Sequence, residues 1–328
     1  MSLECTISFE SWELQEPFEI SRGVLTEIKS LTVRLSDGRG HAGYGEAVGV
    51  AYKGESTSSM AAQIEEVAPR LTADLSGEDL LRLMPPGGAR NAVDCALWDL
   101  RAKKSGRRAW QLAGLPSVEP VQTAYTIGLG SEADVRRKIR AARHLPMLKL
   151  KADAHRHVDM VRFAREEHPE ARLVIDANQA WSRELLERIL PELRALRVEL
   201  IEQPVMRGTD AQLDGLQSPI PLAADESCVD CASLPELQGR YQYVNIKLDK
   251  SGGLTEALAL SRSAKALGFG LMVGNMGGSS LSMAPSHLIA QQCRYVDLDG
   301  PMLTRTDRAP AMRYDGALLH PAEPGLWG

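Results

Sequence analysis

The segment from Leu148 to Asp249 contains five short apolar runs that carry charged side chains: LKLK (148–151), VIDAN (174–178), LIEQP (200–204), AADES (223–227) and VNIKLD (244–249). Their charged groups recur every 22 to 26 residues, which is the length of one strand, one helix and two short loops. Parallel strands at this period, with polar groups at each carboxyl end, are typical of the mouth of a β/α barrel. The sequence therefore predicts an α/β protein with a barrel of the TIM type.

Three of these strand ends carry carboxylates, at Asp176, Glu202 and Asp225. Carboxylates gathered at one pole of a barrel repel one another, and burial adds to the cost unless a cation lies among them. A hard divalent ion with oxygen ligands, above all Mg2+, meets that need. We expect one Mg2+ per subunit at this place.

The first and last of the five runs carry lysines, with Lys149 and Lys151 on one strand and Lys247 on the other. The proton next to a substrate carboxylate is very weakly acidic, but a metal on that carboxylate stabilises the charge that develops when a base removes the proton. Lys149 and Lys151 share one face of their strand, so like-charge repulsion and the cation should favour a neutral amine. We predict that Lys151 and Lys247 form the acid/base pair and that Lys149 lowers the pKa of Lys151.

At these residues the sequence resembles the enolase superfamily, specifically its muconate-lactonising branch, over nearly the whole chain. The strand ends follow one another in the order of that family, and NAVDCALWDL (91–100) resembles its capping domain. The resemblance implies that the three carboxylates are the metal ligands. It also implies that Lys151, the second lysine of K-x-K, and Lys247 are the bases. The expected fold is a modified TIM barrel of the (β/α)7β type with an α+β capping domain.

The residues before the barrel have a different pattern. Residues 3–47 alternate apolar and polar side chains, which predicts an antiparallel meander. Residues 56–104 have a helical period that places these apolar residues on one face: Ala92, Val93, Ala96, Leu97 and Leu100. The tail is rich in Pro and Gly and is expected to fold back across this first domain. We therefore predict a capping domain from residues 1–116 with the tail 311–328, and a barrel domain from residues 117–310.

The first barrel strand is predicted at 121–127 and the last at 295–299, where Asp297 and Asp299 stand two residues apart on one face. Two more acids beside a metal site need a positive partner, so this pair is interpreted as a receptor for a cation. A pair of surface acids is the alternative. The preceding loop GNMGGSS (274–280) either presents backbone N–H groups to a substrate carboxylate or is a plain turn.

The spacing Asp297-x-Asp299 resembles the D-x-D with which dipeptide epimerases of this branch bind the α-ammonium of their substrate. Arg22 resembles the lid arginine that, in the Ala-Glu members, reaches the acidic side chain of the second residue; an exposed surface arginine is the alternative. The resemblance implies a small dipeptide substrate, L-Ala-D/L-Glu. Its C-terminal residue would be inverted at the α-carbon by 1,1-proton transfer through a metal-stabilised enediolate.

Three alternatives stay open. N-acylamino acid racemases and o-succinylbenzoate synthases share the metal and the lysines, but their substrates lack the free ammonium that Asp297 and Asp299 would bind. A cycloisomerase of the muconate type is disfavoured for the same reason. A catalytically silent binding protein would have no need for three metal ligands and both bases.

Composition limits the partners. The formal net charge of -5 leaves no basic footprint for nucleic acid. No apolar run approaches about 18 residues and nothing near Met1 resembles a signal peptide, so we expect no membrane span. Five cysteines, an odd number, are typical of a reduced cytoplasmic protein, and assembly into a homo-oligomer is compatible with the sequence.

Overall fold

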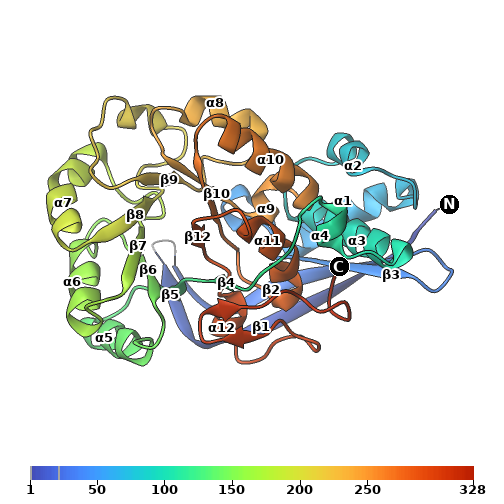
Figure 1. Ribbon diagram of the computed structural model, residues 1–328, viewed down its shortest axis with the longest axis horizontal. Helices are drawn as coiled ribbons and strands as arrows, with labels where there is room; N and C mark the ends of the chain where they lie inside the picture. The colour runs from blue at the N-terminus through green and yellow to red at the C-terminus, as the bar shows by residue number, and fades with distance from the viewer. Residues whose placement is uncertain (1, 21–22) are drawn as a thin grey trace.

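The computed structural model describes residues 2–20 and 23–328, which form an antiparallel sheet with helices beside a curled sheet of parallel strands (Figure 1). The predicted fold class, a capped β/α barrel, is confirmed. Among the described residues, no helix is long and apolar enough to cross a membrane.

The capping domain begins with the predicted antiparallel meander. β1 (Glu4–Ile20), β2 (Gly23–Ser36) and β3 (Ala42–Ala47) pair in that order. The turn between β2 and β3 is stabilised by Asp37, whose carboxylate accepts the backbone N–H of Arg39 at 2.8 Å.

Helices follow this sheet in the capping domain. They are η1 (Ala51–Lys53), α1 (Thr57–Val67), η2 (Ala68–Arg70), α2 (Gly77–Leu83), α3 (Gly88–Ser105) and α4 (Ala109–Leu112). The predicted apolar face of α3, from Ala92 to Leu100, is buried against β2 and β3. The close approach of α3 to β3 requires glycine, because a Cβ at Gly43 or Gly45 would lie 2.1 Å from a backbone oxygen of α3.

The barrel is a parallel sheet of eight strands in sequence order. The strands are β5 (Tyr125–Ile127), β6 (Met147–Lys151), β7 (Arg172–Asp176), β8 (Val198–Glu202), β9 (Leu222–Ala224), β10 (Tyr243–Ile246), β11 (Gly270–Val273) and β12 (Tyr295–Val296). The backbone N–H of Ala124 donates to the carbonyl of Val296 at 2.7 Å, which brings the start of β5 against β12.

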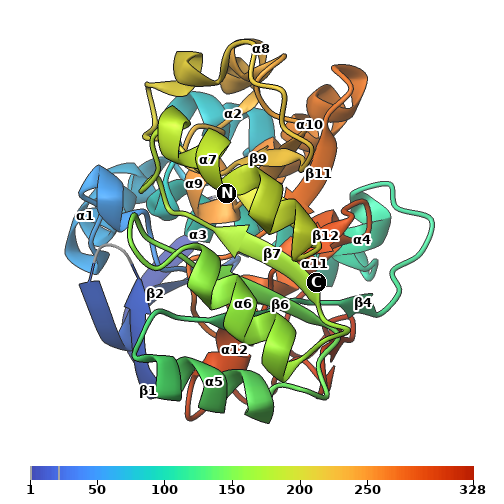
Figure 2. The same ribbon diagram turned by 90° about the vertical axis from the view of Figure 1, so that its left-hand side faces the viewer.

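Helices alternate with these strands and lie outside the sheet. They are α5 (Glu132–Ala141), α6 (Val158–Glu167), α7 (Arg183–Ala195), η3 (Asp210–Leu213), η4 (Cys231–Ser233), α8 (Leu234–Leu237), α9 (Leu248–Ser251), α10 (Leu254–Ala266), α11 (Ser280–Ala290) and α12 (Gly300–Leu303). Figure 2 shows α5, α6 and α7 along the outer side of β6 and β7.

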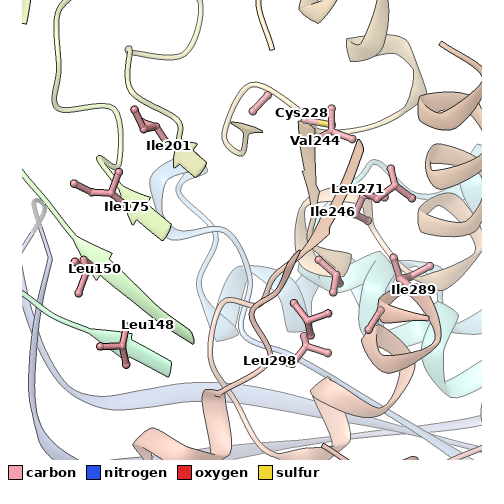
Figure 3. Packing of buried hydrophobic residues seen from close by; sticks show 14 of the residues in the cluster. Leu148, Leu150, Ile175, Ile201, Cys228, Val244, Ile246, Leu271, Ile289 and Leu298 are labelled. Carbon is pink, nitrogen blue, oxygen red and sulfur yellow. The ribbon is translucent and has the colours of Figure 1, made fainter. Parts of the chain in front are cut away.

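Side chains of the barrel strands alternate between two environments. Outward residues such as Leu148 and Leu150 of β6 pack in the cluster beneath the helices (Figure 3). Inward residues form an apolar layer: Ala124, Met147, Val174, Leu200, Ala223, Met272 and Tyr295. Two residues further along β6 and β7, the inward face carries Lys149 and Asp176. The apolar layer is therefore the floor on which the charged groups stand.

The predicted first strand, 121–127, is divided, and this part of the prediction was wrong. A small antiparallel sheet joins β13 (Tyr314–Asp315), β14 (Leu318–Leu319) and β4 (Val121–Gln122). Only β5 belongs to the barrel, because the preceding residues pair with the tail instead. The tail then reaches the capping domain as expected, where the backbone N–H of Gly328 donates to Asp99 of α3 at 2.8 Å.

Asp94 of α3 joins the capping domain to the barrel. Its carboxylate is buried and accepts the backbone N–H of Thr255 at 2.8 Å and the Thr255 hydroxyl at 2.6 Å. A residue of one domain therefore satisfies the first turn of α10 in the other.

We predict that Asp94→Ala lowers the free energy of unfolding by about 1 to 3 kcal/mol, since the backbone N–H of Thr255 loses its acceptor. Urea unfolding of the variant and the parent measures this difference. Asp94→Asn keeps an oxygen beside Thr255 and should lose less. Equal stability of the alanine variant and the parent would contradict the proposed contact.

Candidate active site

The charged residues predicted at the strand ends meet at the carboxyl end of the barrel. In the parallel pairing of β6, β7 and β8, Lys151 lies opposite Asp176, and Asp176 lies opposite Glu202. Asp225 and Lys247 follow directly after β9 and β10. The strand order thus places the carboxylates of β7, β8 and β9 between the lysines of β6 and β10.

Asp176 is fully buried and binds two lysines. Its Oδ2 accepts from Lys151 Nζ at 2.7 Å and lies 3.1 Å from Lys149 Nζ, while Oδ1 accepts the backbone N–H of Asn178 at 2.9 Å. Burial opposes ionisation, but Lys151 and Lys149 hold the pKa of Asp176 well below its usual value. Asp176 is therefore a permanent anion at neutral pH.

Glu202 is also fully buried, with a different balance of charges. Its Oε1 accepts from Asn245 Nδ2 at 2.7 Å, and its Oε2 lies 2.7 Å from Lys149 Nζ. Burial and the charge of Asp176 raise the pKa of Glu202 to about 7, although Lys149 opposes the shift. Sequence analysis missed Asn245. It stands two residues before Lys247 on the inward face of β10, and this spacing is the signal that could have located it.

Asp225 binds Lys247 and a second lysine that sequence analysis missed. Its Oδ2 accepts from Lys247 Nζ at 2.7 Å and its Oδ1 from Lys250 Nζ at 2.5 Å. Lys250 is fully buried and also donates to the backbone carbonyls of Asp225 and Asn245. Burial opposes ionisation, but the two lysines hold the pKa of Asp225 well below its usual value. Lys250 lies on α9, so the period of the strands gave no signal for it.

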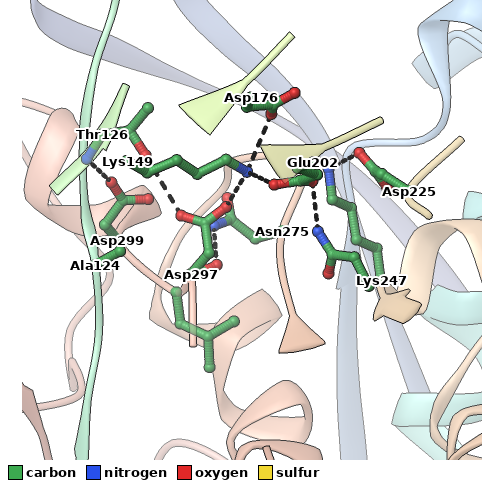
Figure 4. A network of polar contacts seen from close by, with 12 residues as sticks. Ala124, Thr126, Lys149, Asp176, Glu202, Asp225, Lys247, Asn275, Asp297 and Asp299 are labelled. Atoms are coloured by element: carbon green, nitrogen blue, oxygen red, sulfur yellow. Dashed lines mark hydrogen bonds and ion pairs between the residues drawn. The ribbon is translucent and has the colours of Figure 1, made fainter. Parts of the chain in front are cut away.

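Lys149 lies at the centre of this network (Figure 4). Its Nζ is 3.1 Å from Asp176 and 2.7 Å from both Glu202 and Asp297. Burial alone would lower the pKa of Lys149, but the surrounding carboxylates raise it well above its usual value. The pKa of Lys247 is raised in the same way. Lys149 is therefore an ammonium in this arrangement, because its acidic neighbours outweigh burial and the repulsion between lysines. The neutral amine predicted for Lys151 beside a bound cation stays a prediction.

Asp297 and Asp299 are both buried but bind different partners. Asp297 Oδ2 accepts from Lys149 Nζ at 2.7 Å, whereas Asp299 Oδ2 accepts the backbone N–H of Thr126 at 2.7 Å. Burial and the charge of Asp297 raise the pKa of Asp299 to about 7. The premise that both acids lack a positive partner was wrong, since Lys149 already serves Asp297.

The glycine-rich loop 274–280 leads into α11, whose first N–H groups have partners within the chain. The backbone N–H of Ser279 donates to Glu46 of β3, and that of Ser280 donates to Asp307, both at 2.9 Å. Carboxylates of the protein itself therefore stabilise this helix N-terminus. A substrate carboxylate would have to use other groups of the loop.

Arg22, one of the predicted substrate-binding residues, lies outside the described residues. The part of this hairpin that the structure describes contacts the barrel. The backbone N–H of Leu129 donates to the carbonyl of Glu19 at 2.8 Å, and Arg156 Nη2 donates to the Glu19 carboxylate at 2.9 Å. The end of β1 is thus attached to the loops that follow β5 and β6.

The three carboxylates suit a divalent cation chemically. They are buried, come from successive strands and offer oxygen donors. The Oδ1 atoms of Asn178 and Asn245 are buried without a hydrogen-bond partner among the described residues, so two uncharged oxygens are available beside them. Among the residues that the structure describes, no three His, Cys, Asp or Glu side chains lie close enough together to hold a metal. Each of the three carboxylates instead points toward a lysine. A bound cation would compete with these lysines for the same oxygens.

Fold and site together define a class, the capped β/α barrels of the enolase superfamily. Residues 2–114 match the N-terminal domain of mandelate racemase / muconate lactonizing enzyme, and residues 132–326 match the enolase C-terminal domain-like family. The chain belongs to the mandelate racemase / muconate lactonizing enzyme family.

Several relatives are similar over most of their length. The chain is 39% identical to L-Ala-D/L-Glu epimerase of Escherichia coli strain K12 over 95% of this chain and 97% of that protein. It is 41% identical to N-acetyl-D-glutamate racemase of a Pseudoalteromonas species, over 87% and 91%. An enolase family member from Agrobacterium tumefaciens with homology to dipeptide epimerases, solved with sodium and L-Ala-L-Glu, superposes with a TM-score of 0.95 at 43% identity, covering 99% of both chains.

We predict that Lys250→Met lowers the free energy of unfolding by about 3 kcal/mol, because one oxygen of the buried Asp225 carboxylate loses its counter-charge. Urea unfolding in metal-free buffer measures the loss. Lys265→Met, at an exposed lysine of α10, is the matched control and should change stability little. In the double variant Asp225→Asn/Lys250→Met the two losses should be less than additive. Additive losses would show that the two side chains are not coupled.

Proposed function

We propose that this protein is a metal-dependent epimerase that inverts the α-carbon of the C-terminal residue of a dipeptide, with L-Ala-D/L-Glu as the substrate pair. The observation that carries the proposal is the position of Lys151 and Lys247 on either side of three carboxylate-bearing strands. A base on one side and an acid on the other is what inversion at carbon requires. The relatives named as epimerases of L-Ala-D/L-Glu support the choice of substrate.

The metal ligands and the two lysines have separate roles in this reaction. Asp176, Glu202 and Asp225 would hold Mg2+, and the dipeptide epimerases solved with Mg support the choice of ion. When bound, the ion lowers the barrier to proton loss by stabilising negative charge on the substrate carboxylate. Lys151 and Lys247 exchange the α-proton from opposite faces. In each direction one lysine, as the neutral amine, would take the α-proton from one face, and the other, as the ammonium, would return a proton to the opposite face.

Asp297 and Asp299 would receive the α-ammonium of the dipeptide, and Arg22 would contact the acidic side chain of its second residue. Both aspartates are buried just beyond the carboxyl end of β12, which supports this placement. The five cysteines are unpaired, which suits a reducing cytoplasm.

A racemase of N-acylated amino acids is the second candidate. The observation in its favour is the ion pair between Lys149 and Asp297, because an aspartate that already has a cationic partner does not require a substrate ammonium. The relative named N-acetyl-D-glutamate racemase supports the same alternative. Both candidates share the lysines and the metal ligands and differ in what lies beside Asp297.

We predict that Lys151→Ala and Lys247→Ala each lower the rate of epimerisation by about 100-fold to 10,000-fold, the usual contribution of a general acid or base. Deuterium incorporation at the α-carbon, followed by NMR in deuterated water with Mg2+, measures each half-reaction. Each variant should lose exchange with one enantiomer far more than with the other. Lys29→Ala, at a lysine whose side chain is 67% exposed, is the control. Unchanged exchange in either barrel variant would refute the assignment.

We predict that Asp297→Asn raises KM for L-Ala-L-Glu by about tenfold to a hundredfold, since a charged hydrogen bond to the ammonium contributes about 1.5 to 3 kcal/mol. N-acetyl-glutamate is measured with the same two proteins. Any effect of the variant on Lys149 acts on both substrates, so the ratio of their KM changes isolates the ammonium contact. Equal changes, or faster turnover of N-acetyl-glutamate by the parent, would favour the racemase instead.

A further inference from the structure

Asp249 is a buried acid that the proposed chemistry does not use. It stands on α9, two residues after Lys247, and its exposed fraction is 6%. Its Oδ1 accepts the backbone N–H of Val48 at 3.0 Å and that of Gly49 at 2.8 Å. A single oxygen of the barrel therefore holds two consecutive N–H groups of the capping domain.

No lysine or arginine among the described residues forms an ion pair with Asp249. Burial raises its pKa to about 6, against the two backbone N–H groups, and the charge of Glu55 adds to the shift. Burying a carboxylate without an ion-pair partner costs free energy unless hydrogen bonds compensate for the lost hydration. Within the described part of the chain, Asp249 forms its hydrogen bonds with Val48 and Gly49.

These contacts fix the start of a loop that continues through η1 to Glu55. At its other end, the Glu55 carboxylate accepts the backbone N–H of Val50 at 2.7 Å and that of Gly88 at 3.1 Å, which attaches the loop to α3. The backbone of Gly49 has a φ of +84°, and a Cβ there would lie 2.9 Å from Met60 Sδ. The loop 48–55 is therefore held on the barrel side by Asp249 and on the cap side by Glu55.

The short helix α9 connects this loop to the candidate active site. Lys247 directly precedes α9, and Lys250 on the same turn binds Asp225. Because α9 follows the carboxyl end of β10, a loop attached to it lies at the mouth of the barrel. Burial lowers the pKa of Lys53 of η1, and the charges of Arg207 and Lys250 add to the shift.

We propose that Asp249 is a positioning residue that anchors the loop 48–55 against the mouth of the barrel and so contributes to substrate binding without taking part in proton transfer. This inference rests on the proposed function for its kinetic consequence. The anchoring itself rests on the two hydrogen bonds from Val48 and Gly49.

The test compares Asp249→Ala with Asp249→Asn. The alanine variant removes the acceptor, whereas asparagine keeps an oxygen in the same place and removes the charge. Hydrogen–deuterium exchange of peptides covering 48–55 reports on the anchor without any substrate. The expected result is exchange in this loop at least tenfold faster in the alanine variant, the change that about 1.4 kcal/mol of lost stability gives. The asparagine variant should retain most of the protection.

Steady-state kinetics with L-Ala-L-Glu and Mg2+ supply the second measurement. We expect KM to rise about tenfold in Asp249→Ala, equivalent to about 1.4 kcal/mol, with kcat within about twofold of the parent. Unchanged loop exchange in the alanine variant would overturn the anchor. Faster exchange with an unchanged KM, or a loss confined to kcat, would overturn the role in binding.

Two controls separate other failures from this one. Exchange in α1 and β10 should match the parent, and faster exchange throughout the protein would mean that Asp249 supports the whole fold instead of the loop. A parent protein that does not turn over the dipeptide would refute the proposed function, while the exchange measurement would still decide whether Asp249 anchors the loop.

Discussion

The burial of three carboxylates at one end of the barrel is the constraint on which the rest of the site depends. An uncompensated buried charge costs several kcal/mol, so each carboxylate must have a cation within contact distance. The structure meets this requirement with lysines: Lys151 and Lys149 for Asp176, Lys149 for Glu202, and Lys247 with Lys250 for Asp225. The groups proposed to move protons are thus also the groups that allow the carboxylates to be buried.

This constraint also explains the layering of the barrel. Strand side chains alternate, so an inward charged residue must stand two positions from another inward residue. On β6 and β7 the inward residues two positions before Lys149 and Asp176 are Met147 and Val174. Both belong to the apolar layer that closes the barrel below the charged groups. The low dielectric of this floor strengthens the pairing of lysines and carboxylates above it. The packed floor and the charged mouth therefore depend on one another.

The sequence was sufficient to predict the strand ends because period and alternation are local properties. The three carboxylates, the flanking lysines, the meander and the apolar face of α3 were located in this way. It was insufficient wherever a partner is distant in the chain. β4 pairs with the tail, Lys250 reaches Asp225 from a helix, and Asp249 holds a loop about 200 residues earlier. The pairing of Lys149 with Asp297 depends on rotamers, which spacing does not encode.

The pairing of Lys149 with Asp297 bears directly on the two candidate substrate classes, dipeptides with a free amine and N-acylated amino acids. Asp297 Oδ2 is bound to Lys149 Nζ, whereas among the described residues Oδ1 has one long contact, 3.4 Å, with the hydroxyl of Thr126. In the proposed function a substrate ammonium would bind the Oδ1 side without displacing the lysine, and the negative charge of the carboxylate would offset the repulsion between the two cations. An N-acyl group brings no charge and leaves the pair with Lys149 intact. With a free-amine substrate, Asp297 would therefore face two positive charges, whereas with an N-acyl substrate it faces only that of Lys149. The pKa of the neighbouring Asp299 is raised to about 7, so its ionisation would supply a further negative charge beside the ammonium.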